Sequence, residues 1–181
     1  MHVCVASIGR HSGADRENIR VLGGRAIQDE LGVENLCYGC GPQNPEGLHL
    51  KSYWDGDETV CRYQPRPSFM AGPRHVLNGG IIATLIDCHC VCTAVSAVYR
   101  SEGRPMGSDP LVWCVTGSMQ IDYLRPTPIA APVVLRARVE SSDGKRTTVV
   151  CAVYSGETER ARGRVVAVRV PLSWRSPSRP S

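Results

Sequence analysis

The sequence predicts an α+β protein in which one antiparallel β-sheet wraps around one long helix. The first observation is an apolar run without proline at residues 79–99. It is about twenty residues long, which fits one buried helix and is too long for a single strand. Two short strand patterns come before this run, and three or four come after it. A helix and a sheet that each have one apolar face bury those faces against each other.

Length and composition fit a single domain and argue against several classes of protein. The chain has 181 residues, 42% of them apolar, and its formal net charge of +4 is too small to suggest nucleic-acid binding. The start, Met1-His2-Val3-Cys4-Val5, lacks a basic segment followed by an apolar one, so we expect no signal peptide. Asp87 and His89 interrupt the best candidate for a membrane span. We therefore expect a cytoplasmic protein without membrane contact.

The part of the chain before the long helix is expected to hold a short helix and two strands. Apolar positions at helical spacing predict the short helix, although Gly23-Gly24 weakens this prediction. We assign this helix to an N-terminal extension, residues 1–36. The two strands flank the turn Asp55-Gly56-Asp57, and a segment rich in proline and glycine follows them. The expected elements are a helix at 16–31, strands at 48–54 and 58–63, and a loop at 64–77.

The strand patterns after the long helix are separated by turns and proline clusters. The pattern at 132–141 alternates, with apolar residues on one face and charged residues on the other. Residues 173–181 are rich in Ser, Pro and Arg, and we expect them to be a disordered tail. The domain itself is then expected to span residues 37–172. The strand patterns lie at 111–124, 132–141, 146–154 and 160–170.

One carboxylate, Asp87, lies inside the apolar helix. Asp is seldom fully buried unless it is paired, so this position suggests a catalytic group that faces a cleft. The alternative is an Asp that caps or pairs with a loop. Gly79 and Gly80 open the helix, where free N–H groups attract negative charge and glycine lets a carbonyl group approach closely. The alternative for these glycines is a tight turn without a chemical role.

Gly79 and Asp87 lie too far apart to act on one carbonyl group from one helix. Their separation of 87 − 79 = 8 residues corresponds to about 12 Å along a helix axis. If both act on the same carbonyl carbon, they must belong to two copies of the helix. Two antiparallel copies related by a twofold axis would place Gly79 of one copy near Asp87 of the other.

Three segments, in this order and spacing, resemble one known family. The helix opening, Gly79-Gly80 followed by Ala83-Thr84-Leu85 and Asp87, is similar to that of hotdog-fold acyl-CoA thioesterases of the PaaI-like branch. Residues 116–126 resemble the third strand of this family, which ends in a Tyr-x-x-Pro turn, and residues 37–48 resemble its lead-in. The resemblance implies a hotdog fold, hydrolysis of an acyl-CoA to a free acid and coenzyme A, and a homodimer or a dimer of dimers.

The resemblance also implies roles for individual residues. Asp87 is the expected base or nucleophile, Gly79 binds the thioester oxygen, and Thr116 positions the attacking water, unless Thr116 is an ordinary strand residue. Asn78 replaces the His of most relatives; it can cap the helix or donate a hydrogen bond, but it cannot titrate near neutral pH. The residues expected to bind coenzyme A, unless they are solvated surface residues, are Gly80, Ser118, Tyr123, Arg125, Pro126, Lys145 and Arg146.

The cysteines are expected to be reduced and free of metal. Nine cysteines in a chain without a signal peptide argue against a disulfide framework. Cys37-x-x-Cys40 has the spacing of half a zinc site, for which His49 and Cys61 are the nearest further ligands; the alternative is a turn before the first strand.

A second group of cysteines lies just after Asp87. Cys88 and Cys92 share a helix face while Cys90 points elsewhere, which disfavours a metal site on the helix. A reactive thiol is also disfavoured, because the neighbouring carboxylate would raise its pKa. We therefore expect these cysteines to pack around an acyl pocket, and we expect no metal and no cofactor apart from the coenzyme A of the substrate.

Two other functions fit the same fold. A hydratase or dehydratase would need an Asp and a His that act together, and His89 lies only two positions after Asp87 and faces away from it on a helix. A non-catalytic acyl-CoA-binding protein would use the same cleft without turnover. Release of coenzyme A from an acyl-CoA distinguishes the thioesterase from the binding protein.

Overall fold

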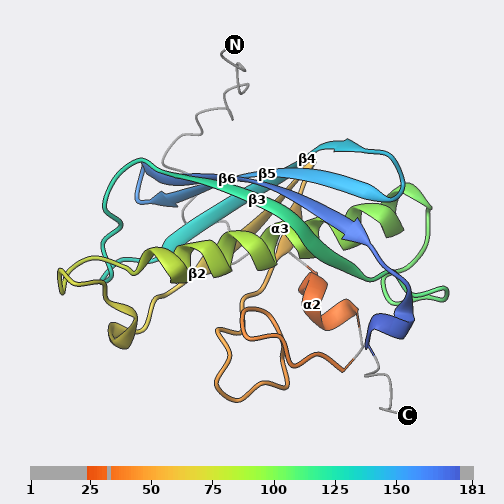
Figure 1. The fold of residues 1–181 in the computed structure, drawn as a ribbon, viewed down its shortest axis with the longest axis horizontal. Helices are drawn as coiled ribbons and strands as arrows, with labels where there is room; N and C mark the ends of the chain where they lie inside the picture. The colour runs from red at the N-terminus through yellow and green to blue at the C-terminus, as the bar shows by residue number, and fades with distance from the viewer. Residues whose placement is uncertain (1–23, 32–33, 176–181) are drawn as a thin grey trace.

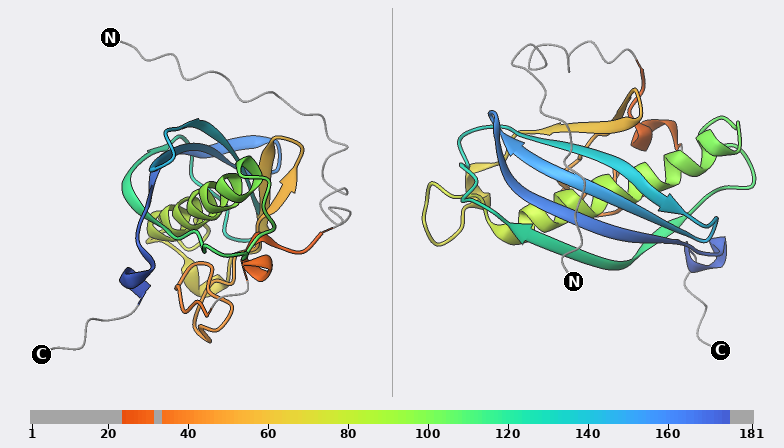
Figure 2. Two further views of the ribbon diagram at one scale, coloured as in Figure 1. Left: turned by 90° about the vertical axis from the view of Figure 1, so that its right-hand side faces the viewer. Right: turned by 90° about the horizontal axis from the view of Figure 1, so that it is seen from above.

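A computed structural model describes residues 24–31 and 34–175 of the chain. Six antiparallel strands form one curved sheet in the order β1-β2-β4-β5-β6-β3, and the long helix α3 lies in its hollow (Figure 1). Figure 2 includes a view close to the axis of α3, in which the sheet curves around the helix. The predicted α+β architecture is confirmed. The elements are α2 (Ile27–Glu30), β1 (Tyr53–Asp55), β2 (Glu58–Tyr63), η2 (Pro67–Phe69), α3 (Gly79–Ser101), β3 (Cys114–Tyr123), β4 (Val133–Ser142), β5 (Arg146–Ser155), β6 (Thr158–Arg169) and η3 (Leu172–Arg175).

The helix α3 forms the centre of the domain. Asn78 caps its first turn, and no proline interrupts it, so it runs close to the predicted bounds. By length and composition α3 could cross a membrane, so the expectation that Asp87 and His89 rule out such a span is wrong. In this fold 61% of its most apolar segment is buried inside the protein, against the sheet.

Alternation along β4 places its apolar side chains toward α3, as predicted. Val133, Leu135 and Ala137 are at most 1% exposed, and they belong to the same core as Leu85 and Ile86 of α3. Burying a side chain of the size of Val or Leu contributes about 1.5–3 kcal/mol to folding. Contact with the sheet therefore stabilises α3 more than intrinsic helix propensity does.

The first strand is shorter than predicted. It begins at Tyr53 instead of residue 48, because the backbone just before it pairs with an earlier loop. The N–H of Leu48 donates to the carbonyl of Tyr38 (2.8 Å), and the N–H of Leu50 donates to that of Gly39 (3.1 Å). These hydrogen bonds fix the Cys37–Cys40 loop against the domain.

The two ends of the chain are described only in part. Of the helix predicted at 16–31, the structure describes α2, which is four residues long; residues 1–23 lie outside the described part. Gln28 joins α2 to the domain through two hydrogen bonds to Ser52. Its Nε2 donates to the Ser52 hydroxyl at 3.0 Å, and its Oε1 accepts the Ser52 N–H at 2.8 Å. At the other end, residues 173–175 belong to the short helix η3 and not to a disordered tail, and 176–181 lie outside the described residues.

Strand β3 is an edge strand with a β-bulge. Among the described residues it pairs with β6 alone, and the pairing register shifts between Thr116 and Ser118, which leaves Gly117 without a partner residue. A side chain at Gly117 would meet the Val168 side chain at 2.7 Å, so glycine is required there. The bulge bends the strand next to Thr116 and changes which face the following side chains occupy.

His89 predicts a loss of stability in acid. Its ring is fully buried, with Nδ1 2.8 Å from the hydroxyl of Ser52 and Nε2 3.2 Å from the carbonyl of Thr59. Burial lowers its pKa to about 4 from an ordinary value of 6.5, so the folded state favours the neutral ring. The contribution of His89 to the free energy of unfolding is fully present above pH 6.5. It is lost as the pH drops toward 4, by up to about 3 kcal/mol for a shift of this size.

Urea unfolding of the wild-type protein and His89→Gln between pH 7.5 and pH 4 checks this prediction. The variant should be less stable at pH 7.5 and should lose less stability on acidification than the wild type. Equal losses in the two proteins would show that His89 does not carry the acid sensitivity.

Candidate active site

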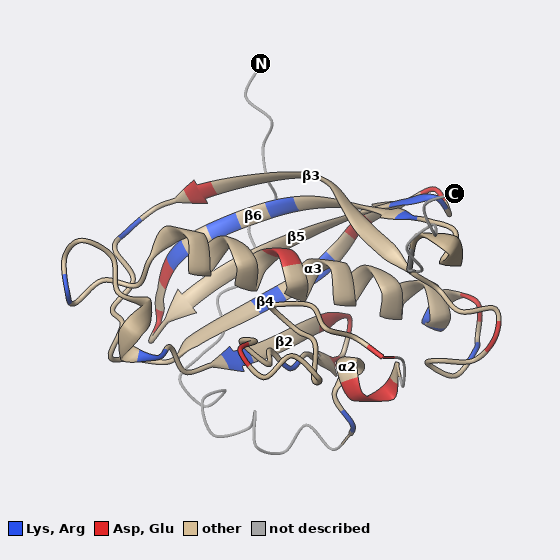
Figure 3. Cartoon of the chain, turned by 60° about the horizontal axis from the view of Figure 1, so that its bottom comes forward, with Lys and Arg blue, Asp and Glu red and all other residues tan. Residues whose placement is uncertain are grey.

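Asp87 and Thr116 form a polar pair between α3 and β3. Asp87 lies in the middle of α3, which otherwise carries only Arg100 as a charged residue, and Figure 3 shows this scarcity of charge along the helix. The Thr116 hydroxyl donates a hydrogen bond to the Asp87 carboxylate. Asp87 is half-buried and Thr116 is exposed, so solvent can reach the pair. The two residues proposed from the sequence to activate and position water are brought together.

An apolar cavity of about 290 Å³ opens beside this pair, and both Asp87 and Thr116 line it. Val91 and Val95 of α3 form one wall, and residues of α2 form another. The contribution of α2 to this cavity was not predicted from the sequence. The spacing of Ile27 and Leu31, four positions apart in the predicted helix, was the signal for an apolar helix face at this place.

The first turn of α3 forms a second group of functional residues. The Asn78 side chain accepts the N–H of Gly80 at 2.7 Å, which confirms the capping role and removes that N–H as a donor to a ligand. The N–H of Gly79 has no acceptor among the described residues. Tyr123 lies over Gly79 and donates its hydroxyl to the Gly79 carbonyl at 2.9 Å. One helix N–H is thus available to a negatively polarised oxygen.

These two groups do not meet within one chain. Strand β3 runs antiparallel to α3, so Thr116 reaches the middle of the helix and Tyr123 reaches its first turn. The seven residue steps from Thr116 to Tyr123 span at most about 23 Å along an extended strand. The structure therefore agrees with the helical spacing: one chain holds two separate half-sites on one face.

The residues expected to bind coenzyme A also fall into separate groups. Tyr123, Arg125 and Pro126 lie near the first turn of α3. Lys145 lies at the opposite end of the sheet, where its carbonyl accepts the N–H of Arg169 at 2.8 Å. Ser118 pairs with Val166 of β6, beyond the bulge. Within one chain these residues therefore form separate groups, and their role in binding coenzyme A stays a prediction.

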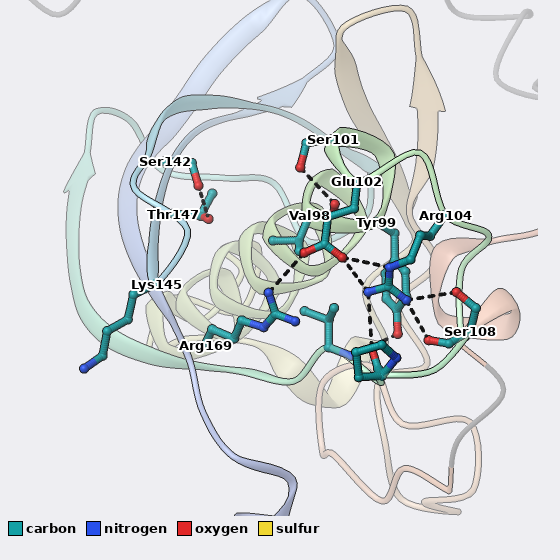
Figure 4. Close-up of polar contacts among 12 residues, drawn as sticks. Val98, Tyr99, Ser101, Glu102, Arg104, Ser108, Ser142, Lys145, Thr147 and Arg169 are labelled. Carbon is teal, nitrogen blue, oxygen red and sulfur yellow. Dashed lines mark hydrogen bonds and ion pairs between the residues drawn. The ribbon is translucent and has the colours of Figure 1, made fainter.

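Ion pairs fix the end of the sheet that carries Lys145 and Arg146. Figure 4 shows Glu102, just after α3, between Arg169 and Arg104. The Glu102 carboxylate lies 3.2 Å from the Arg169 guanidinium and 2.6 Å from that of Arg104. Hydrogen bonds from Arg104 and Arg169 lower the pKa of Glu102. The Lys145 side chain extends from the adjacent turn, away from this cluster (Figure 4).

A curved antiparallel sheet around one long helix, with a carboxylate on that helix facing β3, defines a hotdog-fold protein. Residues 75–162 match the thioesterase superfamily. The crystal structure of a thioesterase superfamily protein from Shewanella loihica is 33% identical, with a TM-score of 0.52, and the match covers 67% of this chain and 91% of that one. The chain belongs to the thioesterase superfamily.

Two further comparisons add detail. The PaaI protein of E. coli, from the phenylacetic acid degradation operon, is 16% identical with a TM-score of 0.56 over 68% of this chain and 81% of that chain, a likeness of fold. The acyl-coenzyme A thioesterase THEM4 of Xenopus laevis is 28% identical over 113 residues, which are 62% of this chain and 45% of that protein. The chain thus spans about half the length of this curated relative.

Proposed function

We propose that this protein is an acyl-CoA thioesterase that hydrolyses the thioester of an acyl-CoA to a free acid and coenzyme A. The observation that carries the proposal is the Asp87–Thr116 pair at an apolar cavity. A carboxylate with a hydroxyl beside it can bind and deprotonate a water molecule. The cavity would hold the acyl chain. The family to which the chain belongs and the name of the THEM4 relative support this chemistry.

In the proposed reaction, Asp87 accepts a proton from water as the water oxygen bonds to the thioester carbon. Negative charge then develops on the former carbonyl oxygen, and the N–H of Gly79 from a second copy stabilises it. When the tetrahedral intermediate collapses, the carbon–sulfur bond breaks and its electron pair goes to sulfur. The proton held by Asp87 ends on that sulfur, which gives the free thiol of coenzyme A and leaves the carboxylate ready for another cycle.

The active form is a homodimer related by a twofold axis. Strand β3 leaves one edge unpaired, and it exposes Met119 (40%) and Tyr123 (54%), which supports pairing with another copy of the strand. Antiparallel pairing of two β3 strands would place the first turn of one α3 near Asp87 of the other. It would also bring Lys145 of one copy toward Arg125 of the other, so both groups of basic residues could meet one coenzyme A.

A non-catalytic acyl-CoA-binding protein is the second candidate. It is favoured by Asn78, whose side chain occupies the N–H of Gly80 and leaves one helix N–H for the thioester oxygen. The hydratase alternative finds no support, because His89 is fully buried and bonded to Ser52 and Thr59 on the far side of α3 from Thr116.

A panel of acyl-CoA substrates with short, long and aromatic acyl groups tests the proposal. We expect release of free coenzyme A with at least one substrate. Coenzyme A should be separated by chromatography, because the free cysteines of the protein would react with thiol reagents. Tight binding of acyl-CoA by calorimetry without any release would contradict the thioesterase and favour the binding protein.

A further inference from the structure

Sulfur atoms from two distant parts of the chain meet beside the cavity. The Sγ atoms of Cys37, Cys40 and Cys88 all lie within 4.8 Å of one another, and those of Cys37 and Cys88 are 3.6 Å apart. The Sγ of Cys92, one turn further along α3, is 3.9 Å from that of Cys40. The Cys40 sulfur thus lies close to the sulfurs of the other three cysteines.

These distances match the ligand set of a tetrahedral metal ion. Four sulfurs about 2.3 Å from a zinc ion lie about 3.8 Å from one another, whereas the sulfurs of a disulfide lie about 2 Å apart. We propose that the thiolates of Cys37, Cys40, Cys88 and Cys92 bind one zinc ion, which joins the N-terminal loop to α3. Cys92 is more than 4.8 Å from at least one of the other sulfurs, so a rotation of its side chain completes the tetrahedron.

The loop that carries Cys37 and Cys40 is already shaped to present both thiols to the helix. The N–H of Gly41 donates to the carbonyl of Cys37 at 2.9 Å, and a side chain at Gly41 would meet the Cys37 nitrogen at 2.4 Å. A side chain at Gly39 would lie 2.2 Å from the Cys88 sulfur. Both glycines are therefore needed for the close approach of the loop to α3.

Side-chain amides surround the sulfurs, as is usual for metal ligands. Asn35 directs its Nδ2 toward the Cys40 sulfur at 3.9 Å, and its Oδ1 accepts the Cys37 N–H at 2.9 Å. Gln28 of α2 lines the same cavity as the four cysteines. Four thiolates around one Zn²⁺ carry a net negative charge, and N–H donors of this kind stabilise it and orient the ligands.

This proposal replaces the expectation that the cysteines hold no metal. His49 and Cys61, the nearest candidates for further ligands beside Cys37 and Cys40, are not in the cluster; Cys61 lies on β2, and burial raises its pKa to about 12. The helix pair at positions i and i+4 supplies the other two sulfurs. Cys90 is fully buried elsewhere on the helix and takes no part in the cluster.

The zinc ion has a structural role in this arrangement. Four protein ligands leave no position for water, so the ion does not activate a nucleophile. Cys88 follows Asp87 directly, and all four cysteines line the cavity. The ion therefore fixes the wall of the cavity beside the carboxylate, and this inference is independent of the reaction that occurs there.

Elemental analysis of the full chain, purified under reducing conditions, tests the proposal. We expect about one zinc ion per chain. Cobalt exchanged into the same protein should give the intense visible absorption of a tetrahedral thiolate site. Removal of zinc with a strong chelator should lower the melting temperature by on the order of 10 °C.

Cysteine variants locate the metal. Cys37→Ala and Cys88→Ala should each lose zinc and the cobalt spectrum, whereas Cys90→Ala, on the same helix, should keep both. Absence of zinc and of a cobalt thiolate spectrum in the wild type would overturn the proposal, even if a variant failed to fold. Full zinc in the Cys37→Ala protein, or a Cys37–Cys88 disulfide in the wild type by peptide mass analysis, would also overturn it.

Discussion

Asp87→Asn is expected to lower the rate of acyl-CoA hydrolysis by on the order of 10²–10⁴-fold, the range typical for loss of a general base. Asn has the same size and can still accept the hydrogen bond that the Thr116 hydroxyl gives to Asp87. It cannot take a proton from water. Because Asp87 is half-buried in an apolar helix, the variant should be as stable as the wild type or more so.

Steady-state hydrolysis, thermal melting and coenzyme A binding should be measured together. Thr116→Ala is the matched variant and should cost less, on the order of 10-fold, because it removes one hydrogen bond to a charged group and leaves the base. Unchanged turnover in Asp87→Asn would show that Asp87 is not the base. A failure to fold would indicate a structural role instead.

Mixed dimers are expected to recover activity that neither parent has. In Asp87→Ala no base remains, and in Gly79→Leu a bulky side chain blocks the helix N–H. The Cβ itself would lie 3.4 Å from the Tyr123 ring, an ordinary contact, so Gly79→Ala is a control that should fold and retain more activity. A dimer of one copy of each blocked variant holds one intact composite site. With equal and random mixing, about a quarter of the wild-type sites are restored.

Two affinity tags, one on each variant, allow the mixed dimer to be isolated before the assay. Activity well above that of both parents would support a site shared between copies. If isolated mixed dimers hydrolyse no faster than the parents, then each chain must hold its own complete site, and Gly79 and Asp87 do not act on one carbonyl.

The fold was predictable where the signal is local. The apolar run without proline determined α3, and the alternation of buried and exposed residues determined β4 and its neighbours to within one or two residues. The start of β1 was not predictable, because residues 48–50 have a strand-like sequence but bond to the Cys37–Cys40 loop. Such pairing depends on the tertiary structure, which no local pattern records.

The residues at the candidate active site could be predicted from the sequence, whereas the cysteine cluster could not. The family resemblance assigned Asp87 and Thr116 to one site, and the position of Asn78 before the helix allowed a capping role. The convergence of four cysteines was missed, because Cys37 and Cys88 are 51 residues apart and helix spacing alone relates only Cys88 to Cys92. Neither half of the cluster has enough ligands by itself.

The bulge at Gly117 determines whether the two half-sites can exist on one face of β3. Side chains in a regular strand alternate, so residues an odd number of positions apart face opposite ways. Thr116 and Tyr123 are seven positions apart, yet both contact α3. The unpaired glycine between them shifts the alternation by one residue, so the two side chains lie on the same face. Loss of this one residue would turn one of the two side chains away from the helix. A change of one residue in the length of this strand would therefore separate the two half-sites.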